Sequence, residues 1–229
     1  MSEHVSSQFD LDLESIRTHI LEMGGLVESQ LLKSIEAFST GNRDLFAQIF
    51  ETENQVNQFE LDIDAECARL IAKRQPTAGD LRLVLSISRI VTDLERCGDK
   101  AVKITKAASK IYGSQKNHIP RLADIRHCGQ LATHMLRRAL DTLARMDADE
   151  ARTLISDDQK LDDAFNAVMR QLITHMMEDP RTISEALDIV WIAKAMERVG
   201  DHATNIAENV IYIVSGTDVR HTTGFGSDV

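Results

Sequence analysis

Apolar side chains recur along most of this chain at every third or fourth position, the spacing that places them on one face of an α-helix. No segment shows the sustained apolar–polar alternation that is typical of a half-buried strand. We therefore expect an all-α protein. The pattern predicts six long helices, over residues 12–39, 44–74, 77–112, 121–145, 147–178 and 182–215.

Turn signals separate these predicted helices. Pro76 and Pro180 interrupt the pattern, and each is followed by a sequence typical of a capping box, Thr77-Ala-Gly-Asp80 and Thr182-Ile-Ser-Glu185. The stretch 113–120 (GSQKNHIP) is the clearest linker. Residues 1–9 and 216–229 are expected to be loose, the latter because they are polar and rich in glycine.

The second half of the chain repeats the first. Glu95-Arg-Cys-Gly-Asp99 lies midway along the third predicted helix, and Glu197-Arg-Val-Gly-Asp201 lies midway along the sixth, 201 − 99 = 102 residues later. Gly25 matches Gly129 in the first helix of each half. Antiparallel packing suits helices joined by short turns. We predict two tandem, internally duplicated antiparallel three-helix bundles, over residues 10–113 and 120–215.

The repeated pentapeptides carry candidate chemistry. Glu and Asp four residues apart lie one turn apart on one helix face, here on the flank of the apolar stripe for both Glu95 with Asp99 and Glu197 with Asp201. Two carboxylates at this spacing repel each other and resist burial. A nearby cation would relieve both costs. Gly98 and Gly200 should let a neighbouring helix approach closely beside the carboxylates.

Further acidic residues lie on the helices expected to face these pairs. Asp158 and Asp162 are four apart on the fifth helix, and Glu53 with Asn57 stands at the matching place on the second. Oxygen ligands suit Mg, Mn or Fe, whereas zinc sites usually include Cys or His. The alternative is that these acidic pairs are solvated, neutralised by neighbouring arginines, and bind no metal.

Composition narrows the function further. There are 26 Lys and Arg against 36 Asp and Glu, giving a net charge of −10, which argues against general nucleic-acid binding. The three cysteines form no CxxC pair and fall on apolar helix positions, as expected for core residues in a reducing compartment. The chain begins with no signal-like segment, and no apolar run is long enough to span a membrane. We expect a cytoplasmic protein.

The third helix also has a basic stripe on the side predicted to face away from the core. It is either a solvated face or a docking surface for an acidic partner, and Trp191, near the outer face of the sixth helix, either marks an interface or packs at a helix junction. The stripe comprises Arg82, Arg89, Arg96, Lys100, Lys103, Lys106 and Lys110.

The chain resembles the PhoU family, the accessory regulators of bacterial phosphate uptake. The two pentapeptides resemble that family's duplicated acidic signature. Other stretches agree, in order and over nearly the whole chain: MGGLVE (23–28), AKRQPTAGDLRL (72–83), ARMDADEA (144–151), MMEDPRTIS (176–184) and GTDVRH (216–221).

The resemblance implies two similar three-helix bundles, often dimeric, with metal clusters of Fe, Mn, Mg or Zn held by the acidic motifs. Asn57 departs from a full carboxylate pair, which leaves metal occupancy of the first half open. The metal ligands that the resemblance implies are, first, Glu95, Asp99, Glu197 and Asp201, followed by Asp158 and Asp162 and last by Glu53.

The resemblance also implies a non-enzymatic regulator that couples the ATPase subunit of the Pst phosphate transporter to the PhoR sensor kinase and restrains the phosphate-starvation response. Such a protein would be cytoplasmic, reaching the inner membrane through its partners. Two alternatives are a di-metal carboxylate enzyme, whose usual Glu-x-x-His motif is absent from the acidic positions, and a metal-free helical scaffold. The residues expected to meet a partner are Arg96, Lys100, Lys103 and Lys106.

Overall fold

The computed structural model describes residues 2–113 and 123–220. Within these ranges the chain contains helices and no strand, which confirms the all-α prediction. The elements are α1 (Ser2–Thr40), α2 (Asp44–Arg74), α3 (Ala78–Gly113), α4 (Ala123–Arg145), α5 (Ala148–Glu178), the 3-10 turn η1 (Pro180–Thr182) and α6 (Ile183–Ser215). Most of the predicted linker lies outside the described residues.

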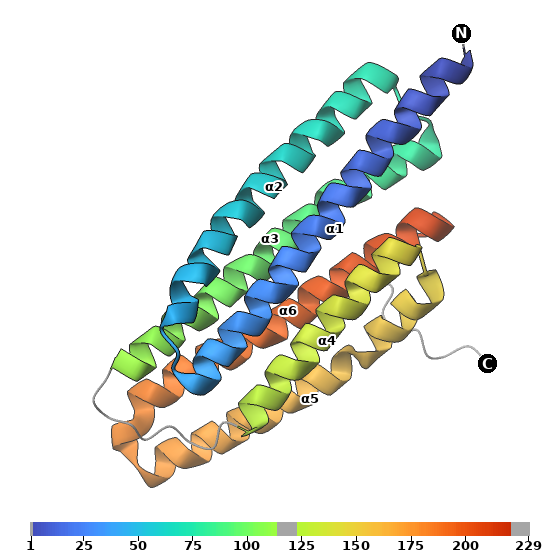
Figure 1. The fold of residues 1–229 in the computed structure, drawn as a ribbon. Helices are drawn as coiled ribbons and strands as arrows, with labels where there is room; N and C mark the ends of the chain where they lie inside the picture. Colours follow the sequence, from blue (N-terminus) through green and yellow to red (C-terminus); the bar gives the residue numbers. More distant parts are fainter. Residues whose placement is uncertain (1, 114–122, 221–229) are drawn as a thin grey trace, which may run out of the picture.

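The helices form two elongated three-helix bundles that lie side by side (Figure 1). Within each bundle every helix contacts the other two, and the bundles meet where α3 packs on α6 and α1 packs on α4. One hydrophobic cluster contains buried side chains from all six helices, so the bundles share a core. Cys67, Cys97 and Cys128 are buried free thiols in that core, as predicted.

Two glycines show how closely the bundles approach each other. A Cβ atom on Gly24 of α1 would lie 2.4 Å from a methyl group of Leu140 on α4, and one on Gly129 of α4 would lie 3.0 Å from a methyl group of Ile35 on α1. The two contacts are related by one offset, since 129 − 24 and 140 − 35 are both 105. Gly24 is therefore the counterpart of Gly129. The predicted match to Gly25 is wrong, because Gly25 is exposed with nothing within 4 Å.

The ends of the chain are more ordered than predicted. Helix α1 already begins at Ser2, so residues 2–9 are helical rather than loose. After α6, Gly216 takes a left-handed conformation (φ +76°) that ends the helix, and Val219 is buried against the core. Residues 216–220 are therefore packed on the bundle, and residues 221–229 lie outside the described residues.

The second predicted capping box does not form. Thr182 has helical backbone angles and makes no side-chain cap hydrogen bond to α6. Its hydroxyl donates to the Asp179 carbonyl instead, while the Asp179 carboxylate accepts from the Arg181 backbone N–H. Asp179 thus begins a 3-10 turn that leads into α6. At the first box, the Thr77 hydroxyl lies 3.2 Å from the Asp80 carboxylate, and the Leu81 N–H donates to the Thr77 carbonyl.

Helix length and hydropathy bear on membrane insertion. Of the helices described, none combines the length and apolar character that would be needed to cross a bilayer.

Candidate functional site

The second-half acidic motif is brought together with α5 as predicted. Glu197 and Asp201 lie half-buried on the flank of α6, and Gly200 between them faces α5. A Cβ on Gly200 would lie 2.3 Å from a methyl group of Leu161 and 3.5 Å from the Asp158 carboxylate. Glycine at this position therefore lets α5 bring Asp158 against the α6 motif. We call Asp158, Asp162, Glu197 and Asp201 the second-half acidic cluster.

The electrostatics of this cluster are those of crowded carboxylates. Burial, followed by the charges of Asp162, Asp201 and Glu197, raises the pKa of Asp158 to about 6. Burial and then Glu197 also raise the pKa of Asp201. One carboxylate oxygen of Glu197, Oε2, is buried without a hydrogen-bond partner. A buried orphan oxygen among carboxylates that resist ionisation is the environment that a cation would stabilise.

The first-half acidic motif meets α2 in the same way. Gly98 lies against α2, because a Cβ there would be 3.1 Å from the Glu53 carboxylate and 3.4 Å from Val56. The buried Gln30 side chain of α1 donates a 2.8 Å hydrogen bond to Glu53. Burial raises the pKa of Glu53 despite that bond, and Asp99 and Glu95 raise it further. Glu53, Glu95 and Asp99 thus face one another across α2 and α3.

Glu60 belongs to the first-half group, although it is not among the ligands that the resemblance implies. Burial raises its pKa, and the Glu95 carboxylate is the next largest cause. Asn57, the position matched to Asp162, is exposed. The signal for Glu60 was present in the sequence, since it lies seven residues, or two turns, after Glu53 on the same face. We call Glu53, Glu60, Glu95 and Asp99 the first-half acidic cluster.

Basic side chains already neutralise part of both clusters. Lys103 Nζ lies 2.8 Å from Asp99, Lys194 Nζ lies 2.5 Å from Glu197, and an Arg198 nitrogen lies 3.0 Å from Asp201. In residues 2–113 and 123–220, no three His, Cys, Asp or Glu side chains are arranged so that they could hold a metal ion. A bound ion would require carboxylates to rotate away from these basic partners.

The donor chemistry nevertheless fits a hard cation. Both clusters offer only carboxylate oxygens, which suit Mg²⁺, Mn²⁺ or iron better than zinc. The second-half cluster fits best, because Glu197 Oε2 is buried without a partner. The residues that would hold an ion there are Glu197, Asp201 and Asp158, with Asp162 beside them.

The basic stripe of α3 is partly covered by α6. Lys110 pairs with Asp188 of α6 at 2.8 Å, and the Arg82 guanidinium lies 5.8 Å from the ring centre of Tyr212. The predicted outward direction is therefore wrong for Arg82, which is half-buried against α6. Lys110 is exposed as predicted, although it pairs with α6. Arg96, Lys103 and Lys106 are exposed. Lys100 is half-buried, and its pKa is lowered first by burial and then by Lys103.

An apolar stripe lies exposed on α6. Ile183, Leu187 and Trp191 follow one another at four-residue spacing, and Trp191 is 69% exposed. The predicted outer position of Trp191 is confirmed. These three residues, which we call the α6 stripe, present an apolar surface of the kind found in protein interfaces.

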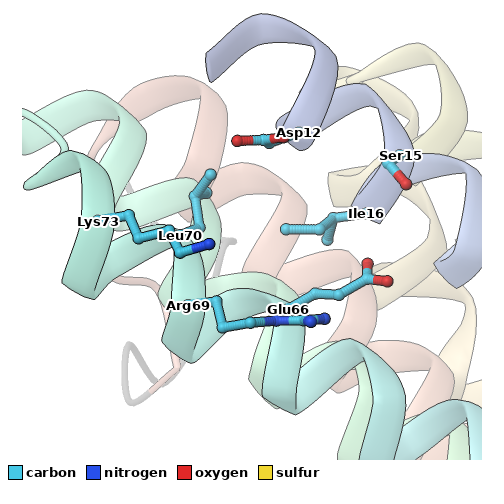
Figure 2. A pocket seen from close by; sticks show the side chains of 7 residues that line it. All are labelled: Asp12, Ser15, Ile16, Glu66, Arg69, Leu70 and Lys73. Atoms are coloured by element: carbon cyan, nitrogen blue, oxygen red, sulfur yellow. The ribbon is translucent and has the colours of Figure 1, made fainter. Parts of the chain in front are cut away.

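A pocket of about 270 Å³ lies between α1 and α2, far along the chain from the acidic motifs (Figure 2). Its walls carry charges of both signs: Asp12 and Glu66 are acidic, and Arg69 and Lys73 are basic. Glu66 contacts His19 at 3.1 Å, and Asp12 contacts Arg74 at 3.2 Å. This balanced set of charges shows no preference for an anion or a cation.

Comparison with known proteins identifies the family. A family model described as the PhoU domain matches residues 20–108 and again residues 125–210. The chain is 46% identical to a Pseudomonas putida protein named phosphate-specific transport system accessory protein PhoU homolog, over 96% of this chain and 86% of that protein. It is 44% identical to the Escherichia coli K12 phosphate-specific transport system accessory protein PhoU, over 98% of this chain and 92% of that protein.

Solved structures agree with this assignment. The crystal structure of PhoU from Pseudomonas aeruginosa matches with a TM-score of 0.87 at 45% identity, covering 91% of this chain and 100% of that one. The phosphate transport system regulatory protein PhoU from Streptococcus pneumoniae matches with a TM-score of 0.84 at 28% identity, covering 92% and 99%. The fold of two tandem three-helix bundles is confirmed, and the chain belongs to the PhoU family.

Proposed function

We propose that this chain is a non-enzymatic regulator of inorganic phosphate uptake and of phosphate-starvation signalling. The observation that carries the proposal is that the acidic motif occurs in both halves of a PhoU-family chain and meets further carboxylates each time. The relatives that match nearly the whole chain are named as accessory proteins of a phosphate-specific transport system.

The partners we propose are the ATPase subunit of the Pst transporter and the PhoR sensor kinase, with this chain as the adaptor between them. The exposed residues Arg96, Lys103 and Lys106, with Lys100 beside them, offer a basic surface for an acidic partner. The α6 stripe offers an apolar surface for a second copy of the chain. This role places the protein in the cytoplasm and, through its partners, at the inner membrane.

The proposal includes metal ions held by the two acidic clusters. Half-buried carboxylates with raised pKa values and the orphan Glu197 Oε2 support an ion in the second-half cluster. When bound, the ion would supply positive charge that fixes α5 against α6. Its role is therefore structural or sensory rather than catalytic, which agrees with the regulatory names of the relatives.

A metal-free scaffold is the second candidate, and one observation favours it. Asp99, Glu197 and Asp201 each contact a basic side chain on their own helix, which already offsets their charge. The two candidates differ in a measurable way: removing metal destabilises a metal-holding regulator and leaves a scaffold unchanged. A di-metal enzyme is less favoured, because His202, the histidine next to Asp201, is buried against Asp93 instead of joining the cluster.

The adaptor role is tested by affinity capture of tagged full-length chain from its host at high phosphate. We expect the Pst ATPase subunit and PhoR to be recovered, and recovery to fall when Lys100, Lys103 and Lys106 are changed to Glu. The same cells should show a constitutive phosphate-starvation response when the chain is deleted. Normal repression in the deletion strain would overturn the proposal.

A further inference from the structure

We propose that a pocket between α3, α6 and the segment after α6 binds inorganic phosphate. The pocket has a volume of about 380 Å³, and three of its lining residues are arginines, Arg89, Arg96 and Arg220. It lies apart from both acidic clusters, since none of their members lines it. The site itself does not depend on metal or on a protein partner. Only the choice of phosphate among oxyanions rests partly on the proposed function.

The arginines converge from two distant parts of the chain. Arg89 and Arg96 lie seven residues, or two turns, apart on one face of α3, and Arg220 arrives from beyond the end of α6. The Arg220 guanidinium and, to a smaller extent, Arg89 hold the pKa of Asp218 below its usual range, which places all three groups within electrostatic reach. Guanidinium groups match the geometry of phosphate oxygens through paired N–H donors.

Arg220 is held in place by the segment that carries it. Gly216 turns the chain in the left-handed region, where a Cβ would lie 2.6 Å from the Arg82 guanidinium. Val219 is buried in the core, and the Arg220 side chain pairs with Asp218, with Nε 2.9 Å from Oδ1. The same carboxylate accepts from the Arg220 backbone N–H at 3.2 Å. The segment GTDVR thus acts as an anchored wall of the pocket.

Two of the lining residues, Asn209 of α6 and Asp93 of α3, supply hydrogen-bond acceptors, which select among oxyanions. Asn209 is only 4% exposed, and its Nδ2 donates to the Asn205 carbonyl, which fixes the amide so that Oδ1 is the free end. That Oδ1 is buried without a partner. Asp93 also lines the pocket, with its carboxylate bonded to His202 at 2.9 Å and to Asn205 at 3.1 Å.

An acceptor beside three arginines suits an anion that still carries a proton. Inorganic phosphate at neutral pH keeps at least one P–OH, which can donate to Asn209 Oδ1 or Asp93 while its other oxygens accept from the arginines. Sulfate has no such donor, and a phosphate monoester dianion has none either. A site with an unmet buried acceptor rejects ligands that cannot satisfy it. The geometry therefore favours inorganic phosphate over both.

The pocket belongs to one side of the α3–α6 contact and is not duplicated. Moving 102 residues along the chain, the offset of the acidic motif, replaces Arg89 by Trp191 and Asp93 by Ala195. The equivalent side of the contact therefore lacks the arginine and the acidic acceptor. One phosphate per chain is the predicted stoichiometry.

The test is calorimetric titration of inorganic phosphate into full-length, metal-free chain in a chloride buffer at pH 7. We expect saturable binding at one site. It should be at least tenfold weaker in Arg89→Gln/Arg220→Gln and unchanged in Arg170→Gln, an exposed arginine of α5 that does not line the pocket. Sulfate and O-phosphoserine should bind at least tenfold more weakly than phosphate, and Asn209→Leu should reduce that preference.

Three results would overturn the assignment. They are no binding at millimolar phosphate, equal binding by wild type and the Arg89→Gln/Arg220→Gln variant, and sulfate or O-phosphoserine binding as tightly as phosphate. Thermal unfolding of each variant checks that the fold is retained, and Arg220, which follows the last helix, is the least disruptive site. Because the titration contains neither metal nor protein partners, a failure to bind phosphate would not count against the adaptor proposal.

Discussion

Asp93 on α3 and His202 on α6 are hydrogen-bonded across the contact between the two bundles, 2.9 Å apart and each less than 10% exposed. The pair joins the two halves of the duplication. Only the first half has an acidic residue at this position, since Ala195 stands where Asp93 would repeat in the second. Removing one partner leaves the other buried and unsatisfied.

We expect Asp93→Ala to lower the free energy of unfolding by about 2 kcal/mol, because His202 and Asn205 both lose their acceptor. A double-mutant cycle with His202→Ala should give a coupling of about 1 kcal/mol. Denaturant unfolding of the four proteins measures both. Strictly additive effects would show that the pair does not tie the bundles together.

The glycines of the bundle make a second prediction. Gly200→Ala should gain roughly 1 kcal/mol of helix propensity but lose about 1–3 kcal/mol to overpacking, because its Cβ would lie 2.3 Å from Leu161. Gly25→Ala, exposed on α1 with open space around it, is the matched control and should stabilise by about 1 kcal/mol. Thermal unfolding distinguishes the two. Equal stabilisation by both substitutions would mean that Gly200 does not set the α5–α6 spacing.

The raised pKa of Asp158 predicts that the stability of the fold depends on pH. Its pKa in the folded chain, about 6, lies above the model-peptide value of 3.8, so the folded state binds the proton more tightly. The stability contributed by protonation is fully present below about pH 4 and is lost as the pH rises through 6. Asp158→Asn imitates the protonated form, and its stability relative to wild type should therefore rise between pH 4 and pH 7.

The expected gain in the free energy of unfolding is on the order of 1 kcal/mol, reduced from the full pKa shift because Asp158 is only half-buried. Denaturant unfolding of metal-free protein at several pH values measures it. Asp163→Asn, exposed on the same helix, controls for replacing a carboxylate with an amide. A stability difference that does not vary with pH would contradict the raised pKa.

Charge reversal tests the basic surface of α3. Changing Lys100, Lys103 and Lys106 to Glu should weaken binding to the purified Pst ATPase subunit at least tenfold and reduce its salt dependence, since the lost contacts are electrostatic. Arg126→Glu/Arg170→Glu, on exposed faces of α4 and α5, changes the net charge by −4 elsewhere, against −6 for the three lysines. Surface plasmon resonance at two salt concentrations makes the measurement. If both variants lose affinity alike, the effect is one of net charge rather than of this surface.

Local signals predicted the helices well. The bounds of α2 were predicted to the residue, from Asp44 to Arg74, because Gly41 and Pro76 punctuate a clear apolar period. The start of α1 was missed because residues 2–9 contain little apolar periodicity to extend. At α6, Thr182 and Glu185 match a capping motif in the sequence. In the structure, however, Asp179 caps a 3-10 turn that precedes the helix, and Thr182 makes no capping hydrogen bond.

Contacts between helices were harder to predict. A helical wheel correctly placed four acidic residues on half-buried flanks: Glu95, Asp99, Glu197 and Asp201. It succeeded because the apolar stripe shows which face of a helix packs against the other helices of its own bundle. The same wheel pointed Arg82 outward, because it contains no information about α6 packing on α3. The arginine pocket depends on that packing and on the fold of residues 216–220, so no periodicity within one helix could have indicated it.

The most direct test of the central claim is metal analysis of the acidic clusters. Full-length chain, purified without chelators, is compared by inductively coupled plasma mass spectrometry with Glu197→Gln/Asp201→Asn. Glu95→Gln/Asp99→Asn tests the first half, and Glu22→Gln/Glu36→Gln, exposed on α1, serves as the control. We predict near-stoichiometric iron, manganese, magnesium or zinc in wild type and control, and its loss in the Glu197→Gln/Asp201→Asn variant. Wild-type protein free of metal even after incubation with these ions would contradict the account and leave the acidic clusters as ion-paired surface of a scaffold.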